Sequence, residues 1–258
     1  NWRSASATLG LSAFETLVEM TALRAYTLGE RASTEGRPEQ AIALYERAIS
    51  IDSGFAMAYR KLAAELSNIG AEPSRIILAT RKAFESRDRL PPLEGHLVAA
   101  LYYTKAHYDP DSSIAAYRAA LRLDSASLPA LNNLSQILRE RRQFSEAERL
   151  AERAMVIDPE PWQFYQNAVA AEVAQAKYSE AEGTIGRLSA AAPGGEDNSN
   201  VVRLRAELAA ARRDFGTAES MFRRLLADSS RSWKRTANLG LFAVERVRGR
   251  LAKSAEHM

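Results

Sequence analysis

Histidine is the residue type in this chain best suited to metal binding or acid–base chemistry, and it occurs three times, as His96, His107 and His257. His96 and His107 are eleven residues apart, so they could share one face of a helix across three turns. No carboxylate or third ligand lies at ligand spacing from this pair, and the chain has no cysteine. We therefore expect helix-surface or groove histidines, no bound metal and no disulfide.

Other arrangements that carry catalysis or hold a cofactor do not stand out either. No glycine-rich loop precedes a Lys-Ser or Lys-Thr pair, and Gly194-Gly195 lies in a polar stretch that favours a flexible connection. Neither a Ser-His-Asp set nor a pair of catalytic carboxylates emerges from the many surface charges. Neighbouring charges such as Glu148, Arg149 and Glu152 are typical of a solvated helix face. The sequence predicts neither an enzyme nor a cofactor.

The composition is that of a folded chain with balanced charge. Of 258 residues, 46% are hydrophobic, and 35 Lys and Arg against 32 Asp and Glu leave a net charge of +3. Nearly every arginine has an acidic residue within a helical turn, so no basic face for nucleic acid is predicted. The longest apolar stretch, residues 97–103, is far shorter than the roughly 20 residues that span a bilayer. We expect a soluble segment without direct membrane insertion.

A repeated pattern gives the elements that position these side chains. Small and large residues recur at fixed spacing in Ala41, Tyr45, Ala48 and Ser53, and the same spacing returns five more times. The copies begin at positions 41, 76, 113, 147, 181 and 218, which are 35, 37, 34, 34 and 37 residues apart. Such a period indicates stacked structural repeats rather than one globular core.

Each repeat also has an earlier half with helical periodicity. In residues 59–66 and 131–138 the apolar side chains recur at steps of three and four, which predicts an amphipathic helix. Short turn signals, such as Glu35-Gly36-Arg37-Pro38, separate the two halves. Asp52, Asp124 and Asp158 follow the second halves, and we interpret them as structural residues at helix ends rather than as catalytic carboxylates.

This unit of about 34 residues, a helix-turn-helix with small residues in both helices and Pro near its end, resembles the tetratricopeptide repeat. The resemblance implies an all-α fold, a right-handed superhelical α-solenoid of stacked antiparallel helix pairs with six to seven repeats. Residues 1–20 are expected to form an N-terminal extension or leading helix, with a capping box at Ser12 and Glu15. The expected repeats are residues 21–54, 55–90, 91–126, 127–160, 161–194, 198–231 and, in part, 233–258.

Close packing between the paired helices explains the small residues. Helices approach closely where Gly29, Ala48 or Ala63 occupies the crossing, and large rings such as Tyr45 and Tyr117 then fill the space between pairs. In the last repeat, the second helix would extend only from about residue 250 to residue 258. We expect this truncation to leave an apolar face open.

A second resemblance concerns residues 22–63, which include ALRAYTLG, EGRPEQAIALYERAISIDS and GFAMAYRKLA. They are similar to the region that follows the kinase domain and single transmembrane helix of some bacterial serine/threonine protein kinases. This resemblance implies a sensor or docking appendage, either outside the cytoplasm as part of a membrane-anchored protein or otherwise cytoplasmic. The kinase's own catalytic motifs are not present in this sequence.

In tetratricopeptide repeats the first helix of each pair lines a concave groove. The resemblance implies that this polar, net basic groove face binds a peptide or protein segment. The residues of the face are Tyr26, Arg60, Lys61, Tyr102, Lys105, Asn132, Asn133, Gln136, Arg139, Gln163, Gln166, Asn167 and Arg203. Some relatives hold a C-terminal carboxylate with Lys and Asn, a set that Lys61, Lys105 and Asn132 match only in part.

The functional prediction is a non-enzymatic protein–protein interaction module, a docking or sensor region of a bacterial signalling protein. The alternative is a scaffold subunit permanently packed in a larger assembly, possibly of the membrane, through its open C-terminal face. The sequence leaves open which of the two surfaces binds, what the partner is, the oligomeric state, and whether the chain, which starts at Asn1 rather than Met, is a piece of a longer kinase or regulator.

Overall fold

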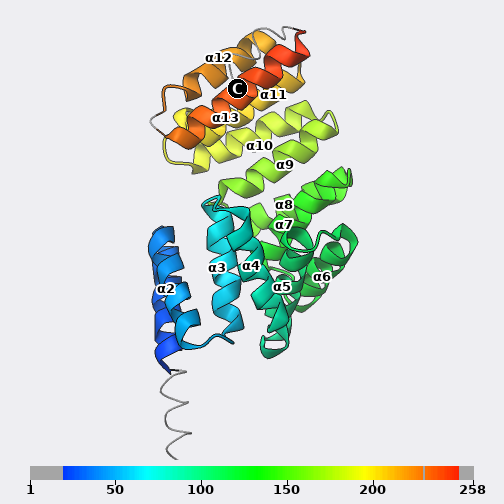
Figure 1. Ribbon diagram of the computed structural model, residues 1–258. Helices are drawn as coiled ribbons and strands as arrows, with labels where there is room; N and C mark the ends of the chain where they lie inside the picture. Colours follow the sequence, from blue (N-terminus) through cyan, green and yellow to red (C-terminus); the bar gives the residue numbers. More distant parts are fainter. Residues whose placement is uncertain (1–19, 229, 250–258) are drawn as a thin grey trace, which may run out of the picture. The chain divides into compact units, whose positions relative to one another are not determined.

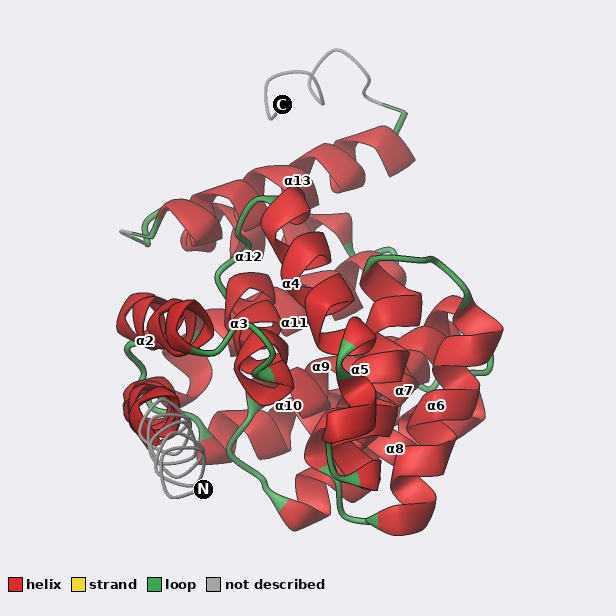
Figure 2. Cartoon of the chain, turned by 60° about the horizontal axis from the view of Figure 1, so that its bottom comes forward, coloured by secondary structure: helices red, strands yellow, loops and turns green. Residues whose placement is uncertain are grey.

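The computed structural model describes residues 20–228 and 230–249, and these residues form helices and turns without any β-strand. The chain divides into two compact units, and the boundary along the sequence falls between Ser125 and Ala126. In each unit, successive helices pack side by side as antiparallel hairpins (Figures 1 and 2). Ser12, Glu15, His257 and the expected second helix at residues 250–258 lie outside the described residues.

Unit 1 begins with a helix over residues 20–34 and continues through five further α-helices. Their bounds are α2 Pro38–Ile51, α3 Ala56–Asn68, α4 Pro73–Glu85, α5 Pro92–Lys105 and α6 Pro110–Leu123, with a short 3-10 helix η1 at Arg87–Arg89. Three of the predicted repeat ranges, residues 21–54, 55–90 and 91–126, therefore each hold two α-helices.

Unit 2 repeats this arrangement. Its bounds are α7 Leu128–Glu140, α8 Phe144–Ile157, α9 Trp162–Ala174, α10 Tyr178–Ala191, α11 Ser199–Ala211, α12 Phe215–Leu225 and α13 Arg231–Val247, with a 3-10 helix η2 at Gly195–Asp197. The ranges 127–160, 161–194 and 198–231 again each hold two α-helices. The last helix within the described residues, α13, starts two residues before the predicted start at residue 233.

No helix within the described residues combines the length and the hydropathy needed to cross a bilayer.

In five of the six helix pairs within the described residues the turn has the same backbone conformation, and the α5–α6 pair is the exception. A residue with positive φ stands at equivalent places in five pairs, as Gly36, Gly70, Arg142, Ala176 and Arg213. The left-handed conformation satisfies carbonyl groups at the end of the first helix, as in Arg37 N–H donating to Ala32 O at 2.9 Å. The position in the repeat thus sets the turn conformation, which residues other than glycine also adopt.

The aspartates after the second helices have the structural role predicted for them. Asp52, Asp124 and Asp158 each follow the last residue of a helix, and each donates its backbone N–H to a carbonyl four residues earlier. The carboxylates of Asp52 and Asp158 also accept a hydrogen bond from a backbone N–H two residues further along. These contacts stop the helix and turn the chain toward the next repeat.

Close contact between a small residue and an aromatic ring holds the first pair of helices together. A Cβ added to Gly29 would lie 2.7 Å from Tyr45 Cε1, and Tyr45 is fully buried. Ala41, Ala48 and Ala63 are also completely buried. The predicted packing of small residues against large rings is therefore seen here.

The same device recurs at the end of unit 2. Gly240 of α13 faces the ring of Phe222 of α12 so closely that a Cβ at Gly240 would overlap it. Phe222, Leu225, Leu241 and Val244 form the core of this last group of helices. The close approach of α12 and α13 therefore depends on the missing side chain at residue 240.

The glycine requirement predicts opposite effects for two Gly→Ala changes in unit 2. Gly240→Ala should lower the free energy of unfolding by about 1–3 kcal/mol, because the ring of Phe222 must move. Gly183→Ala, at an exposed position of α10 with open space around its Cβ, should raise it by about 0.5–1 kcal/mol through helix propensity. Urea unfolding followed by circular dichroism measures both, and equal effects would contradict the packing argument.

Candidate functional site

In unit 1 the predicted groove residues Arg60 and Lys61 are already paired within the chain. Arg60 Nε lies 2.6 Å from Glu94 Oε2, and the two side chains are 13% and 23% exposed. Lys61 Nζ lies 2.5 Å from Glu30 Oε2. The net basic face predicted from the sequence is therefore weakened here, because intramolecular carboxylates neutralise both cations.

Tyr26 lies beside these ion pairs. Its ring centroid is 5.8 Å from that of Tyr45 and 5.2 Å from that of Phe55, so the side chain is part of an aromatic cluster and is half-buried. Burial, followed by the negative charge of Glu30, raises the pKa of the Tyr26 phenol above its ordinary value. Tyr45 donates its hydroxyl hydrogen to Glu30 as well. Tyr26 therefore packs between repeats, and its place in a groove stays a prediction.

Tyr102 and Lys105 lie at the end of α5. The Tyr102 ring stacks on Phe84, with centroids 3.9 Å apart, and His107 also stacks with it at 6.0 Å. Lys105 is exposed. His107 lies beyond the last residue of α5, so the idea that His96 and His107 share one helix face is wrong. The helix ends two residues before His107, and the chain turns there into α6.

In unit 2 the structure brings three predicted asparagines together. Asn167 of α9 donates from Nδ2 to Asn132 Oδ1 of α7 at 2.9 Å, and Asn132 Nδ2 donates to Asn133 Oδ1 at 3.1 Å. Asn167 is 7% exposed, while Asn132 and Asn133 are half-buried. The result is a polarised row of amides across the first helices of two successive repeats, which ends on the Asn133 amide group.

The remaining groove candidates of unit 2 differ in exposure. Gln136 and Gln163 are exposed, whereas Gln166 and Arg139 are half-buried. The buried Arg139 Nε has no hydrogen-bond partner among the described residues. These residues lie on α7 and α9, the helices that carry the asparagine row.

Arg203 is buried in α11 and stands against the neighbouring repeat. It is 7% exposed, its Nη1 donates to Glu207 at 2.9 Å, and its guanidinium lies 5.2 Å from the Trp162 ring centroid. Its charge is therefore paired within the chain, like the charges of Arg60 and Lys61. The net basic face predicted from the sequence is reduced accordingly.

The sequence analysis did not identify the carboxylates that pair with Arg60, Lys61 and Arg203, although the repeat spacing points to the partner of Arg60. Glu94 follows Arg60 by 34 residues, one repeat length, so stacking places both side chains at neighbouring positions. The structure also corrects the prediction for Glu148. The sequence places this residue on a solvated helix face, but its side chain is only 13% exposed and accepts hydrogen bonds from Lys177 in the next helix pair.

Comparisons with known proteins agree with this architecture. Residues 25–55 and residues 130–161 each match a family model described as tetratricopeptide repeat. A comparison with curated protein sequences gave no significant match. The chain therefore contains tetratricopeptide repeats, one recognised in each unit.

Solved structures share the fold at low sequence identity. A tetratricopeptide repeat protein from Parabacteroides merdae is 11% identical, with 92% of this chain and 91% of that chain covered and a TM-score of 0.61. PilW, a type IV pilus biogenesis factor, is 15% identical, with 83% and 97% covered and a TM-score of 0.60. PilF of Pseudomonas aeruginosa is 17% identical, with 89% and 99% covered and a TM-score of 0.56. These likenesses confirm the predicted all-α, tetratricopeptide-repeat-like fold class.

The Arg60–Glu94 contact predicts a stability difference between two kinds of ion pair in unit 1. Arg60→Met should lower the free energy of unfolding by about 1–3 kcal/mol, because it leaves the carboxylate of Glu94 half-buried without its cation. Lys82→Met breaks an exposed pair with Glu85, in which both side chains are more than 45% exposed, and should cost less than about 0.5 kcal/mol.

Urea unfolding measures both changes. The double variant with Glu94→Gln should recover part of the loss seen in Arg60→Met, since the neutral amide tolerates the absence of the guanidinium. Equal losses for Arg60→Met and Lys82→Met would show that the Arg60 pair is as weak as a surface contact.

Proposed function

We propose that the chain is a non-enzymatic protein-interaction module that binds an extended segment of another protein along the first helices of unit 2, α7, α9 and α11. The observation that supports this most directly is the amide row, in which Asn167 donates to Asn132 and Asn132 donates to Asn133. The buried end of the row is fixed by hydrogen bonds, and its Asn133 end is half-buried at the surface.

An amide group matches the chemistry of a peptide backbone. The Asn side chain offers a carbonyl acceptor and two N–H donors, which pair with the N–H and C=O of an extended chain. Gln163 and Gln166 add the same groups one repeat further along, on α9. Recognition through backbone groups selects an extended conformation more strongly than a particular side-chain sequence.

Charge is expected to contribute less than the sequence predicted. Arg203 is paired with Glu207 and packs on Trp162, so a bound segment would meet a guanidinium whose charge is already compensated. In unit 1, Lys105 is exposed, while Arg60 and Lys61 have partners. The partial match to a carboxylate-binding set, Lys61, Lys105 and Asn132, therefore gives no support for a C-terminal carboxylate as the main ligand.

The proposed setting of this module is bacterial signalling, as a docking or sensor region. That setting rests on the similarity of residues 22–63 to the repeat region of bacterial kinases, and the structural likenesses bear on the fold alone.

Binding at unit 2 predicts a localised effect of substitution. Extended peptides selected against the whole chain from a displayed random library should bind Asn133→Ala or Gln166→Ala about tenfold more weakly, because each change removes a bidentate amide. The matched control is Arg149→Ala on α8, where the side chain is 68% exposed and lies 4.0 Å from Glu146. Fluorescence anisotropy with labelled peptides gives the dissociation constants. Equal affinities for all variants would remove α7 and α9 from the binding surface.

A second candidate function, a scaffold subunit, is favoured by one apolar surface in unit 2. A cavity of about 440 Å³ lies between α11, α12 and α13, and it is lined mainly by apolar side chains that include Phe215, Ala243 and Val247. Leu239 and Val247 are 57% and 67% exposed. An apolar face of this kind is typical of a contact with another protein.

If the scaffold alternative holds, the isolated chain should associate with itself through this face. Sedimentation equilibrium should show a mass that rises with concentration for the native sequence. The double variant Leu239→Lys and Val247→Lys should remain at one mass, because two charges on the face oppose burial. Identical sedimentation of both proteins would argue against this surface.

A further inference from the structure

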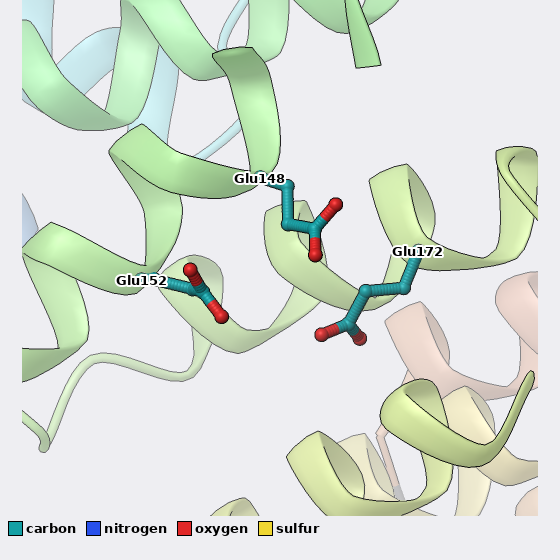
Figure 3. A group of neighbouring side chains, drawn as sticks. All are labelled: Glu148, Glu152 and Glu172. Atoms are coloured by element: carbon teal, nitrogen blue, oxygen red, sulfur yellow. The ribbon is translucent and has the colours of Figure 1, made fainter. Parts of the chain in front are cut away.

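Three glutamates of unit 2 turn their carboxylates toward a common space. Glu148 and Glu152 lie one turn apart on α8, and Glu172 lies on α9 (Figure 3). One oxygen of each carboxylate lies within 4.8 Å of the others. Like charges at this distance repel one another unless a positive charge or a proton lies between them.

Glu172 occupies a core position of the repeat. It is 2% exposed, and the residue 34 positions earlier, Leu138, is completely buried. Glu172 Oε1 accepts a hydrogen bond from Thr184 Oγ1 at 2.8 Å, whereas Oε2 is buried and accepts none from any described residue. A carboxylate oxygen buried without a partner is costly, so its presence at an apolar position calls for compensation by a cation or a proton.

The nearby cations satisfy Glu148 rather than Glu172. Lys177 Nζ lies 2.7 and 2.9 Å from the two oxygens of Glu148, and Gln175 Nε2 donates to the same carboxylate at 2.6 Å. Arg187 donates from Nη2 to Thr184 Oγ1 at 3.0 Å, and its charge favours the ionised form of Glu172. Three carboxylates against two cations leave a net negative charge, and burial raises the pKa of Glu172 by more than Thr184 and Arg187 lower it.

We propose that Glu148, Glu152 and Glu172 form a binding site for a hard divalent cation, with Ca²⁺ as the ion that fits the spacing best. All three ligands are carboxylate oxygens, which favour Ca²⁺, Mg²⁺ and Mn²⁺ over softer metals. Oxygens bound to one Ca²⁺ at about 2.3–2.6 Å can be as far as roughly 5 Å apart, whereas the shorter Mg²⁺ bonds limit them to about 4.2 Å. The three oxygens all lie within 4.8 Å of one another, which is inside the largest separation that Ca²⁺ allows between two of its ligands.

The burial of the three residues suits a site open on one side. Glu152 is exposed, Glu148 is half-buried and Glu172 is buried. A cation would enter beside Glu152, keep water molecules on that side and contact the buried Glu172 oxygen on the other. The site would link α8 to α9 across the boundary between two repeats.

Calcium titration of the whole chain, after removal of metals with a chelator, tests this site. Isothermal titration calorimetry should detect one Ca²⁺ per chain, with weaker binding of Mg²⁺. A Ca²⁺ concentration about 100 times the dissociation constant should raise the midpoint of thermal unfolding by roughly 5–10 °C. Glu172→Gln should weaken binding at least tenfold and abolish the shift, while the charge-matched control Glu160→Gln, at an exposed position outside the cluster, should change neither.

A further variant distinguishes a cation site from a merely structural carboxylate. Lys177→Met removes the ammonium group that competes for Glu148 and should tighten Ca²⁺ binding by about threefold to tenfold. The proposal is overturned if Ca²⁺, Mg²⁺ and Mn²⁺ all leave the native chain's unfolding midpoint unchanged, which would indicate that a proton satisfies Glu172. It is also overturned if Glu172→Gln binds Ca²⁺ as tightly as the native chain.

Discussion

The structure depends on how closely the paired helices approach one another. No single helix pair can bury its apolar face, so stability comes from contacts within and between neighbouring pairs. At Gly29 and Gly240 the approach is so close that the ring of Tyr45 or Phe222 occupies the place of a side chain. This contact fixes the small and aromatic positions of the repeat, and it leaves the outward faces of the helices free to carry other chemistry.

The helix pairs and their turns were predictable because their signals are local. A step of three or four residues defines each helix face, and the helix ends at Asp52, Asp124 and Asp158 are marked by neighbouring turn residues. The position of His107 was not predictable in this way. The spacing from His96 to His107 fits a continuous helix. The helix instead ends at Lys105, and the chain turns toward Asp109, whose side chain caps α6.

The candidate site was only partly predictable because its contacts join different repeats. The sequence identified Asn132 and Asn167 as residues of one face, and the hydrogen bond between them agrees with that placement. Considered one residue at a time, however, Arg60 looked like a free cation, since Glu94 lies a whole repeat away. Glu172 was likewise hidden, because only its equivalence to Leu138 shows that a carboxylate occupies a core position. The stacking of repeats thus pairs charged side chains that look free to bind a partner when the sequence is considered one residue at a time.

Helix α9 connects the two proposed sites of unit 2. Asn167 and Glu172 are five residues apart, which places them roughly 140° apart around the helix axis at about 100° per residue. One therefore contacts α7 through Asn132, while the other contacts α10 through Thr184. A ligand at either side would restrain the same helix. Within the described residues no hydrogen bond joins the amide row to Glu172, so any influence of one site on the other must act through the packing of α9. Such an influence would be equal in both directions.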